Sequence, residues 1–68
     1  MITLVFNIGV LLNRQERYRE AIAYFEKALG NESYSTPENA LTNLGYAYFK
    51  LGNTSKAKIY HQKALDIT

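Results

Sequence analysis

Residues 43–53 read Asn43-Leu44-Gly45-Tyr46-Ala47-Tyr48-Phe49-Lys50-Leu51-Gly52-Asn53. Apolar residues recur here at spacings of three and four, which predicts an amphipathic helix, and Gly52-Asn53 ends it. The pattern resumes after this break and runs through Ala57 and Tyr60 to Ala64-Leu65. A short turn between two helices requires them to pack antiparallel, so this half of the chain is predicted to form a helical hairpin.

The same pattern occurs once earlier in the chain, beginning at Asn7-Ile8-Gly9. An offset of 36 residues superposes the two copies. The matched pairs are Asn7 with Asn43, Gly9 with Gly45, Ala21 with Ala57, Tyr24 with Tyr60, and Lys27-Ala28-Leu29 with Lys63-Ala64-Leu65. Internal repeats of roughly 20 to 50 residues are typical of solenoid proteins. The sequence therefore predicts two hairpins of the same design.

Four helices are expected, over residues 2–13, 18–29, 37–51 and 55–67. No run alternates between apolar and polar residues as a strand would, so the predicted fold class is all-α. Gly30 is expected to end the second helix in the left-handed conformation that glycine adopts readily.

The third helix has two alternative start signals. Either Ser35 caps it and Glu38 completes a capping box, or Thr36 caps it with Pro37 at the first helical position. The fourth helix is expected to be capped by Asn53 or by Thr54.

Each helix has an apolar face that should pack against its neighbours. These faces comprise Leu4, Val5, Ile8, Leu11 and Leu12; Ala21, Tyr24, Phe25, Ala28 and Leu29; Leu41, Leu44, Ala47, Tyr48 and Leu51; and Ala57, Tyr60, His61, Ala64 and Leu65. Gly9 and Gly45 lie inside helices, where glycine costs about 1 kcal/mol relative to alanine. That cost is explained if another helix passes too close to each glycine to leave room for a side chain.

Composition narrows the possible functions. The net charge is +2 and the signs are interspersed, whereas a nucleic-acid site needs basic residues gathered on one face. There are no cysteines, which excludes disulfides and thiolate metal sites, and His61 is the only histidine. No catalytic constellation or phosphate loop accompanies it, so we expect a packed or half-buried His61, no enzyme activity, no cofactor and no metal.

No segment approaches the roughly 20 apolar residues of a membrane span. The apolar start also lacks the basic leader of a signal peptide. We therefore expect a soluble, cytoplasmic chain, or a piece of one.

The repeated residues resemble the tetratricopeptide repeat family. The resemblance is carried by Leu44-Gly45, Tyr48, Gly52, Ala57 and Ala64-Leu65, and again by Ile8-Gly9, Leu12, Ala21, Phe25 and Ala28-Leu29. It implies antiparallel hairpins over residues 2–30 and 37–67, joined by a loop over 31–36. These would stack as a short right-handed α-solenoid that is a fragment of a longer repeat domain.

The chain departs from the family pattern in four places. Val5 and Leu41 stand where an aromatic residue is expected early in the first helix of each repeat. The family period is about 34 residues, so the two extra residues here are placed in the Gly30 to Thr36 loop. Glu16 stands where the turn glycine belongs, and His61 stands where an aromatic residue is usual. These departures make the first hairpin the weaker match.

The resemblance also implies a binding mode. In such solenoids the first helix of each hairpin lines a concave groove, and the groove holds a protein segment or short peptide. The residues expected to line the groove are Phe6, Asn7, Val10, Asn13 and Arg14 from the first hairpin and Asn39, Asn43, Tyr46, Phe49 and Lys50 from the second.

Asn7 and Asn43 stand out because asparagine is a mediocre helix former yet recurs at the same place. Its amide both donates and accepts hydrogen bonds, so the two side chains are hypothesised to form a ladder along a peptide backbone. The alternative is that both are surface residues or bond to a neighbouring helix. Tyr46 and Phe49 offer an apolar wall, although they could instead pack against a following repeat.

Three narrower possibilities concern the ligand. Arg14 and Lys50 could attract a carboxylate, but Phe6 and Val10 occupy the positions of the lysine and asparagine with which some family members clamp a C-terminal carboxylate. Residues 60–65 and the Asn-bearing helices are similar to the tetratricopeptide regions of Gram-positive regulators that sense secreted signalling peptides. A pentatricopeptide repeat, which binds RNA, is a competing but less favoured interpretation.

Self-association is the alternative role. Solenoids usually need at least three repeats and polar ends, and two repeats are recognised here. Apolar residues expected to be uncovered are Leu4 and Leu11 on the first helix and Ile59, Ala64 and Ile67 on the last. The isolated chain is therefore expected to form homo-oligomers by end-to-end stacking or by exchanging a hairpin.

Overall fold

The computed structural model describes residues 2–67, and these form four α-helices. They are α1 (Ile2–Arg14), α2 (Tyr18–Leu29), α3 (Pro37–Lys50) and α4 (Thr54–Ile67). Every helix begins and ends within one residue of its expected boundary. The predicted all-α fold is confirmed.

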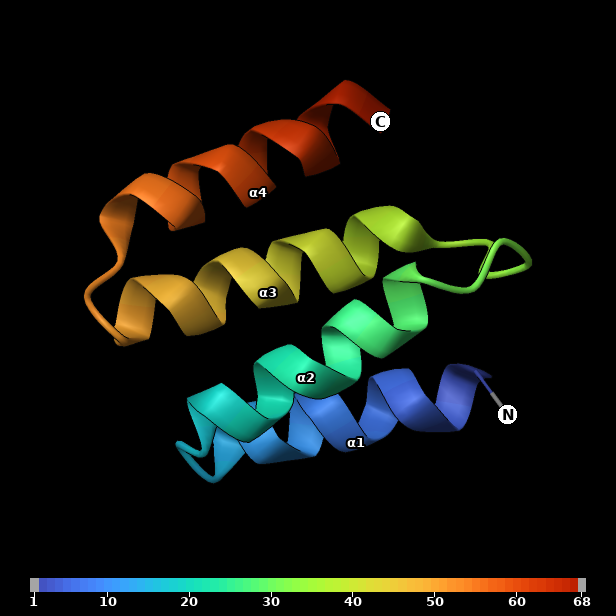
Figure 1. The fold of residues 1–68 in the computed structure, drawn as a ribbon, viewed down its shortest axis with the longest axis horizontal. Helices are drawn as coiled ribbons and strands as arrows, with labels where there is room; N and C mark the ends of the chain where they lie inside the picture. The colour runs from blue at the N-terminus through green and yellow to red at the C-terminus, as the bar shows by residue number, and fades with distance from the viewer. Residues whose placement is uncertain (1, 68) are drawn as a thin grey trace.

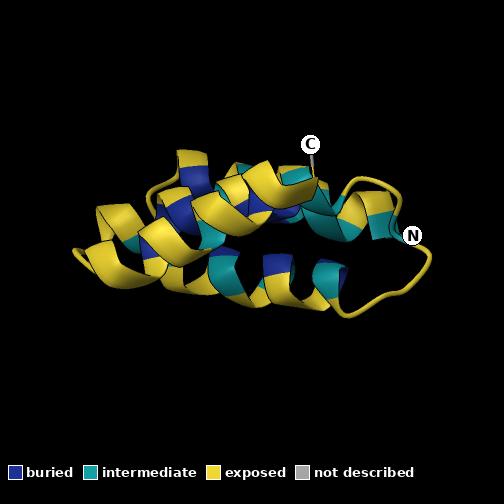
Figure 2. Ribbon diagram, turned by 90° about the horizontal axis from the view of Figure 1, so that it is seen from above, coloured by how far each residue is buried: buried dark blue, intermediate teal, exposed yellow. Residues whose placement is uncertain are grey.

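The helices are arranged as two consecutive hairpins (Figure 1). α1 packs with α2, α3 packs with α4, and α2 also packs along α3, whereas α1 and α3 meet over a narrower contact. The described residues span 30 × 27 × 15 Å. Because a helix with its side chains is roughly 10 Å across, the molecule is thin and each helix keeps one face open to solvent (Figure 2).

The core lies where α1, α2 and α3 meet. Its buried members are Leu12, Ala21, Phe25, Ala40 and Leu44, of which Phe25 and Leu44 are the largest that are fully buried. Burying a side chain of this size contributes about 1.5–3 kcal/mol each. Periodicity identified all of these except Ala40, which lies one turn before Leu44 on the same helix.

Both helical glycines lie at close helix–helix approaches, as expected. A Cβ atom added to Gly9 would lie 2.7 Å from Cε1 of Phe25 on α2. A Cβ atom added to Gly45 would lie 2.8 Å from Cδ2 of His61 and 3.2 Å from the carbonyl oxygen of Ala57, both on α4. At both glycines the facing helix therefore occupies the space of a side chain.

Both hairpins turn by the same hydrogen-bonded motif. Arg17 N–H donates to the Leu12 carbonyl at 2.9 Å, and Asn53 N–H donates to the Tyr48 carbonyl at 2.9 Å, five residues back in each case. The residue before each donor is left-handed, with φ of +61° at Glu16 and +86° at Gly52. Each turn is thus a Schellman motif, and only the second has the glycine that suits it.

Replacing Glu16 with glycine should raise the free energy of unfolding by about 0.5–1 kcal/mol. A non-glycine residue in the left-handed region costs about 1–2 kcal/mol, and the substitution relieves this strain in the folded state. Glycine also makes the unfolded chain more flexible, which offsets about 0.4–1 kcal/mol of that gain. Urea denaturation followed by circular dichroism measures the change. Gly52→Ala is the matched reverse substitution and should destabilise; a loss of stability in Glu16→Gly would show that the Glu16 side chain itself stabilises the turn.

The structure corrects the predicted end of α2 and selects one of the two predicted starts of α3. Gly30 has φ of −74°, so the predicted left-handed conformation is wrong. Its N–H still donates to the Glu26 carbonyl at 3.0 Å, and the chain leaves the helix from a right-handed turn. At the start of α3, Thr36 is the capping residue and Pro37 is the first helical residue, without a side-chain capping bond.

α4 begins with a side-chain cap and is held by aromatic contacts. Lys56 N–H donates to Asn53 Oδ1 at 3.2 Å, so Asn53 is the cap. Tyr60 stacks on Tyr48 of α3 with ring centroids 5.5 Å apart and planes 6° apart. Lys56 Nζ lies 5.1 Å from the Tyr48 centroid and Lys63 Nζ lies 5.3 Å from the Tyr60 centroid, each contact worth about 0.5–1 kcal/mol.

Three expectations for α4 are wrong. His61 and Leu65 are exposed although they were assigned to the packed face. Ala64 is buried, as its assignment to the packed face predicted and contrary to the expectation that the end of the chain leaves it uncovered. Among the helices described, only α3 packs against α4. In the first hairpin the equivalent of His61 is Phe25, which is fully buried because α3 covers it as well.

Candidate functional site

The structure brings together five of the residues expected to line a groove. Val10, Asn13 and Arg14 of α1 and Asn43 and Tyr46 of α3 line an open pocket of about 300 Å³, called here the α1–α3 pocket. It lies where the first helices of the two hairpins meet. The 36-residue repeat places these two helices in equivalent positions, which is why residues far apart in sequence converge.

Asn13 forms the hydrogen-bonded link between the two helices. Its Nδ2 donates to the main-chain carbonyl of Asn43 at 3.2 Å, and the residue is only 7% exposed. Its Oδ1 atom is buried without a hydrogen-bond partner among the described residues. An unsatisfied buried acceptor costs about 1–3 kcal/mol.

Asn43 and Asn7 do not have equivalent surroundings. Asn43 is half-buried, and its Nδ2 donates to the Asn39 carbonyl one turn back at 2.8 Å. Asn7 is exposed and does not line the α1–α3 pocket. Of the four asparagines on α1 and α3, only Asn13 and Asn43 line the α1–α3 pocket, and the Oδ1 atom of Asn13 is buried beneath its surface.

The aromatic part of the site is Tyr46. It is 44% exposed, its ring packs edge-on against Tyr18 of α2 at 6.2 Å and 68°, and Lys50 Nζ lies 5.9 Å from its centroid. The pKa of the Tyr18 hydroxyl is raised, first because burial disfavours its ionised form and then because of Tyr46. Tyr18 was not predicted, since it lies at the start of the second helix rather than on the first.

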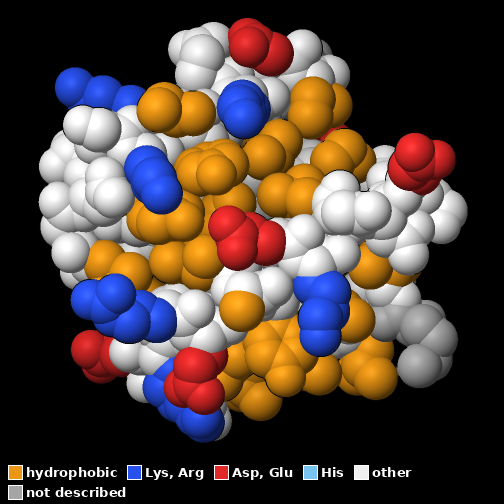
Figure 3. All heavy atoms as spheres, in the orientation of Figure 1, with side chains coloured by type: hydrophobic (Ala, Val, Ile, Leu, Met, Phe, Trp, Pro, Cys, Tyr) orange, Lys and Arg blue, Asp and Glu red, His pale blue; other side chains and the backbone are white. Residues whose placement is uncertain are grey.

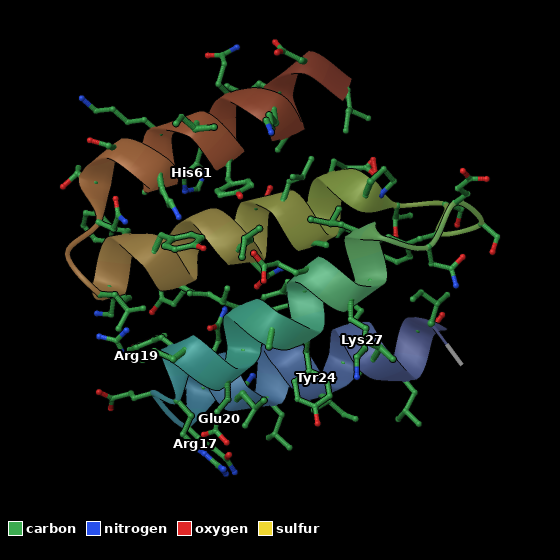
Figure 4. All side chains as sticks on the ribbon, in the orientation of Figure 1. Arg17, Arg19, Glu20, Tyr24, Lys27 and His61 are labelled. Carbon is green, nitrogen blue, oxygen red and sulfur yellow. The ribbon has the colours of Figure 1, made fainter. Side chains whose placement is uncertain are left out.

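The basic side chains near the α1–α3 pocket lie at one end of α1 and α3. Arg14 and Lys50 occupy the last turns of α1 and α3, whose C-terminal ends lie on the same side of the molecule (Figure 1). α1 has no acidic residue, and Glu38 in the first turn of α3 is the only one on either helix. Arg17, by contrast, pairs with Glu20 at 2.6 Å on α2 (Figure 4), which lowers the Glu20 pKa through that hydrogen bond.

Comparison with known families gives one result. A family model for the tetratricopeptide repeat matches residues 1–68. The chain belongs to the tetratricopeptide repeat family. Tetratricopeptide repeats generally mediate protein–protein interactions as non-catalytic scaffolds. No curated protein and no solved structure matches the chain in the corresponding searches.

The remaining candidate residues of this tetratricopeptide repeat chain lie outside the α1–α3 pocket. Phe6 packs on Phe25 and Tyr34, with ring centroids 5.8 and 6.1 Å away. Phe49 is exposed beside Lys50. Asn39 lines a separate hollow of about 380 Å³ between α3 and α4.

That second hollow corresponds to a covered surface in the first repeat. Its lining includes His61, Ala64 and Leu65, and the 36-residue offset relates these to Phe25, Ala28 and Leu29. His61 points from α4 toward α3 (Figure 4), where its ring lies against Gly45. The hollow is thus the second repeat's version of the face on which α3 packs in the first.

Two further properties bear on the kind of site this is. Within residues 2–67 no three His, Cys, Asp or Glu side chains gather as a metal site would require. Nor is any helix in that range long and apolar enough to cross a membrane.

Proposed function

We propose that this tetratricopeptide repeat chain is a binding scaffold that holds an extended protein segment or short peptide against α1 and α3. The observation that supports this most is the convergence of Val10, Asn13, Arg14, Asn43 and Tyr46 around one open pocket. The pocket combines apolar walls, the amide-bearing residues Asn13 and Asn43, and the cation of Arg14. Specific ligand sites typically have this mixture of apolar lining and a few placed polar groups.

An extended peptide suits this surface better than a compact ligand. The α1–α3 pocket is shallow and at the lower end of the roughly 300–1,000 Å³ of small-molecule sites. The exposed rings of Tyr46 and Phe49 continue this surface along α3. A chain lying across α1 and α3 could place successive side chains on these features.

Selection from a displayed library of random short peptides tests this proposal. A selected peptide should perturb the backbone amide resonances of residues 10–14 and 43–46 in the isotope-labelled chain. Tyr46→Ala should weaken that peptide roughly tenfold, as for a central aromatic contact. The matched control is Ile59→Ala, an exposed apolar residue on α4, which should leave affinity unchanged; peptides that perturb only α4 would refute the proposal.

A narrower form of the proposal is that the ligand is a signalling peptide. It is supported only by the similarity of residues 60–65 and of the Asn-bearing first helices to peptide-sensing regulators. In that form, binding would also change the oligomeric state of the chain.

The second candidate function is self-assembly, and one comparison within the chain favours it. Leu4 and Leu11 are 55% and 52% exposed, while their repeat equivalents Ala40 and Ala47 are fully buried. At the other end of the molecule, Leu65 is exposed, whereas its repeat equivalent Leu29 packs against the core. An end-to-end contact between copies would reuse the junction that joins the two repeats; a light-scattering mass of one chain at high micromolar concentration would rule it out.

A further inference from the structure

We infer that the edge of the molecule formed by its two hairpin turns binds single-stranded nucleic acid. This edge, called here the turn edge, comprises residues 14–20 and 49–58. It shares only Arg14 with the α1–α3 pocket, and the inference does not rest on the proposed peptide binding. Two independent features carry it: cations that gather on this edge against the preference of the helices, and an exposed aromatic ring among them.

The fold separates charges that are interspersed along the sequence. Both hairpin turns lie at the same edge of the molecule, opposite the loop over residues 31–36 (Figure 1). The turn edge has six cations against the carboxylates of Glu16 and Glu20, whereas the rest of the chain has two cations against four carboxylates. The six cations are Arg14, Arg17, Arg19, Lys50, Lys56 and Lys58, all exposed. Basic residues gathered on one face in this way are typical of nucleic-acid sites.

The two turns adjoin, so their cations belong to one surface. Leu51 of the second turn lines a hollow of about 260 Å³ together with residues 16–20 of the first. Tyr18 at the start of α2 packs edge-on against Tyr46 of α3, with ring centroids 6.2 Å apart. Arg17 pairs with Glu20, and the other five cations form no ion pair within the described residues. These five are therefore available to phosphate groups.

Helix stability does not account for these cations. A cation stabilises the C-terminal end of a helix and destabilises the N-terminal end. Arg14 and Lys50 suit this rule, but Arg19 and Lys56 lie in the first turns of α2 and α4. α4 has no acidic residue in its first turn and no basic residue in its last, and Asp66 lies next to its final residue. The charges of α4 thus oppose its dipole, and a polyanion bound at the turn edge would offset that cost.

Phe49 provides a ring on which a base can stack. It lies in the last turn of α3 and is 59% exposed. Its carbonyl accepts the Gly52 N–H at 3.0 Å, which holds the residue at the hairpin turn beside Lys50. Proteins that bind single strands combine cations along the backbone with exposed rings that stack on the bases. The turn edge has both elements.

A single strand suits this edge better than a membrane surface does. The exposed carboxylates of Glu16 and Glu20 lie among the cations. A flat anionic surface laid on the edge would bring its own charges against these carboxylates. A flexible strand can direct its phosphates toward the cations and away from the carboxylates, while its unpaired bases are free to contact Phe49.

Fluorescence anisotropy with labelled dodecauridylate tests the inference on the whole chain. The logarithm of the affinity should fall with the logarithm of the salt concentration with a slope of about −2 to −3, as for three or four neutralised phosphates. Lys56→Gln combined with Lys58→Gln should weaken binding roughly tenfold at low salt and bring the slope closer to zero by about 1.4. Lys27→Gln combined with Lys63→Gln makes the same change in net charge outside the turn edge and should weaken binding only about twofold.

Phe49→Ala separates contact with the bases from attraction of charge. It should weaken dodecauridylate binding roughly tenfold and leave the salt slope unchanged. Binding of heparin, a polyanion without bases, should not change. Leu65→Ala removes an exposed apolar side chain near the other end of α4 and should affect neither ligand. Melting curves establish that each variant is folded.

Three results would overturn the inference. Equal weakening by the two lysine pairs would place the binding outside the turn edge. An unchanged affinity in Phe49→Ala would show that dodecauridylate is held by charge alone. Sedimentation of the chain with phosphatidylserine vesicles, without an anisotropy change for dodecauridylate, would assign the turn edge to a membrane. None of these results concerns the α1–α3 pocket, so the peptide-binding proposal is tested separately.

Discussion

Replacing Gly9 with alanine should lower the free energy of unfolding by about 2 kcal/mol. The added Cβ would lie 2.7 Å from Cε1 of Phe25, a ring that is fully buried and cannot move aside. Such overpacking costs about 1–3 kcal/mol or more, which outweighs the gain of about 1 kcal/mol from the better helix propensity of alanine. Urea denaturation followed by circular dichroism measures the difference.

Gly45→Ala is the matched control because it makes the same change at the equivalent position of the second repeat. The nearest atom there belongs to His61, which is exposed and can turn away, although the Ala57 carbonyl oxygen at 3.2 Å stays close. The better helix propensity of alanine should then cancel most of the steric cost, so the free energy of unfolding should change by less than about 1 kcal/mol. Equal losses at the two positions would show that His61 is held as rigidly as Phe25.

Phe25→Ala should have the largest effect on stability, about 3–5 kcal/mol. Phe25 is fully buried, lies beside Gly9 and packs against Phe6 at 5.8 Å. Small domains of this length are held by only about 3–5 kcal/mol in total. The variant should therefore lose its cooperative thermal transition and most of its helical circular-dichroism signal at ambient temperature.

Phe49→Ala removes the same side chain from a surface position and serves as the control. Phe49 is 59% exposed, and substitutions at such positions usually change stability by less than about 0.5 kcal/mol. Its melting curve should stay close to that of the parent chain. A cooperative transition retained in Phe25→Ala would contradict the assignment of Phe25 to the centre of the core.

The helices and their pairing could be predicted because their signals are local. Apolar periodicity, Gly52-Asn53 and Thr36-Pro37 define the segments, and the close approach at Gly9 follows from the cost of a helical glycine. These signals repeat after 36 residues, so each supports the other. Gly30 is the exception, because the direction in which the chain enters the loop, rather than the preference of glycine, sets its φ.

Which surfaces are covered could be predicted only in part, because coverage depends on the neighbouring helix. Leu4, Leu11, Ile59 and Ile67 are exposed as expected. Periodicity assigned Leu65 to a packed face, yet it is 68% exposed because α3 alone packs against α4. Asn13 was assigned to a groove as a polar surface residue, and its burial follows from the crossing of α1 and α3. The sequence identified the residues of the candidate site better than the contacts among them.

Figure 3 shows apolar side chains gathered across the middle of one face of the molecule, with charged side chains placed around and between them. This exposed apolar surface is a consequence of the thin arrangement of the helices. Contiguous exposed apolar surface is typical of proteins that meet other macromolecules.

α4 contributes just two small residues, Ala57 and Ala64, to the buried set and otherwise relies on the Tyr48–Tyr60 stack. Elements with few buried apolar contacts open at a fraction of the global unfolding free energy. The main-chain amides of α4 should therefore exchange with deuterium well before those of α2, which is packed on two sides. In such an opened state α1, α2 and α3 would remain together, and the surface of α3 around Gly45 would become accessible to a helix from another molecule.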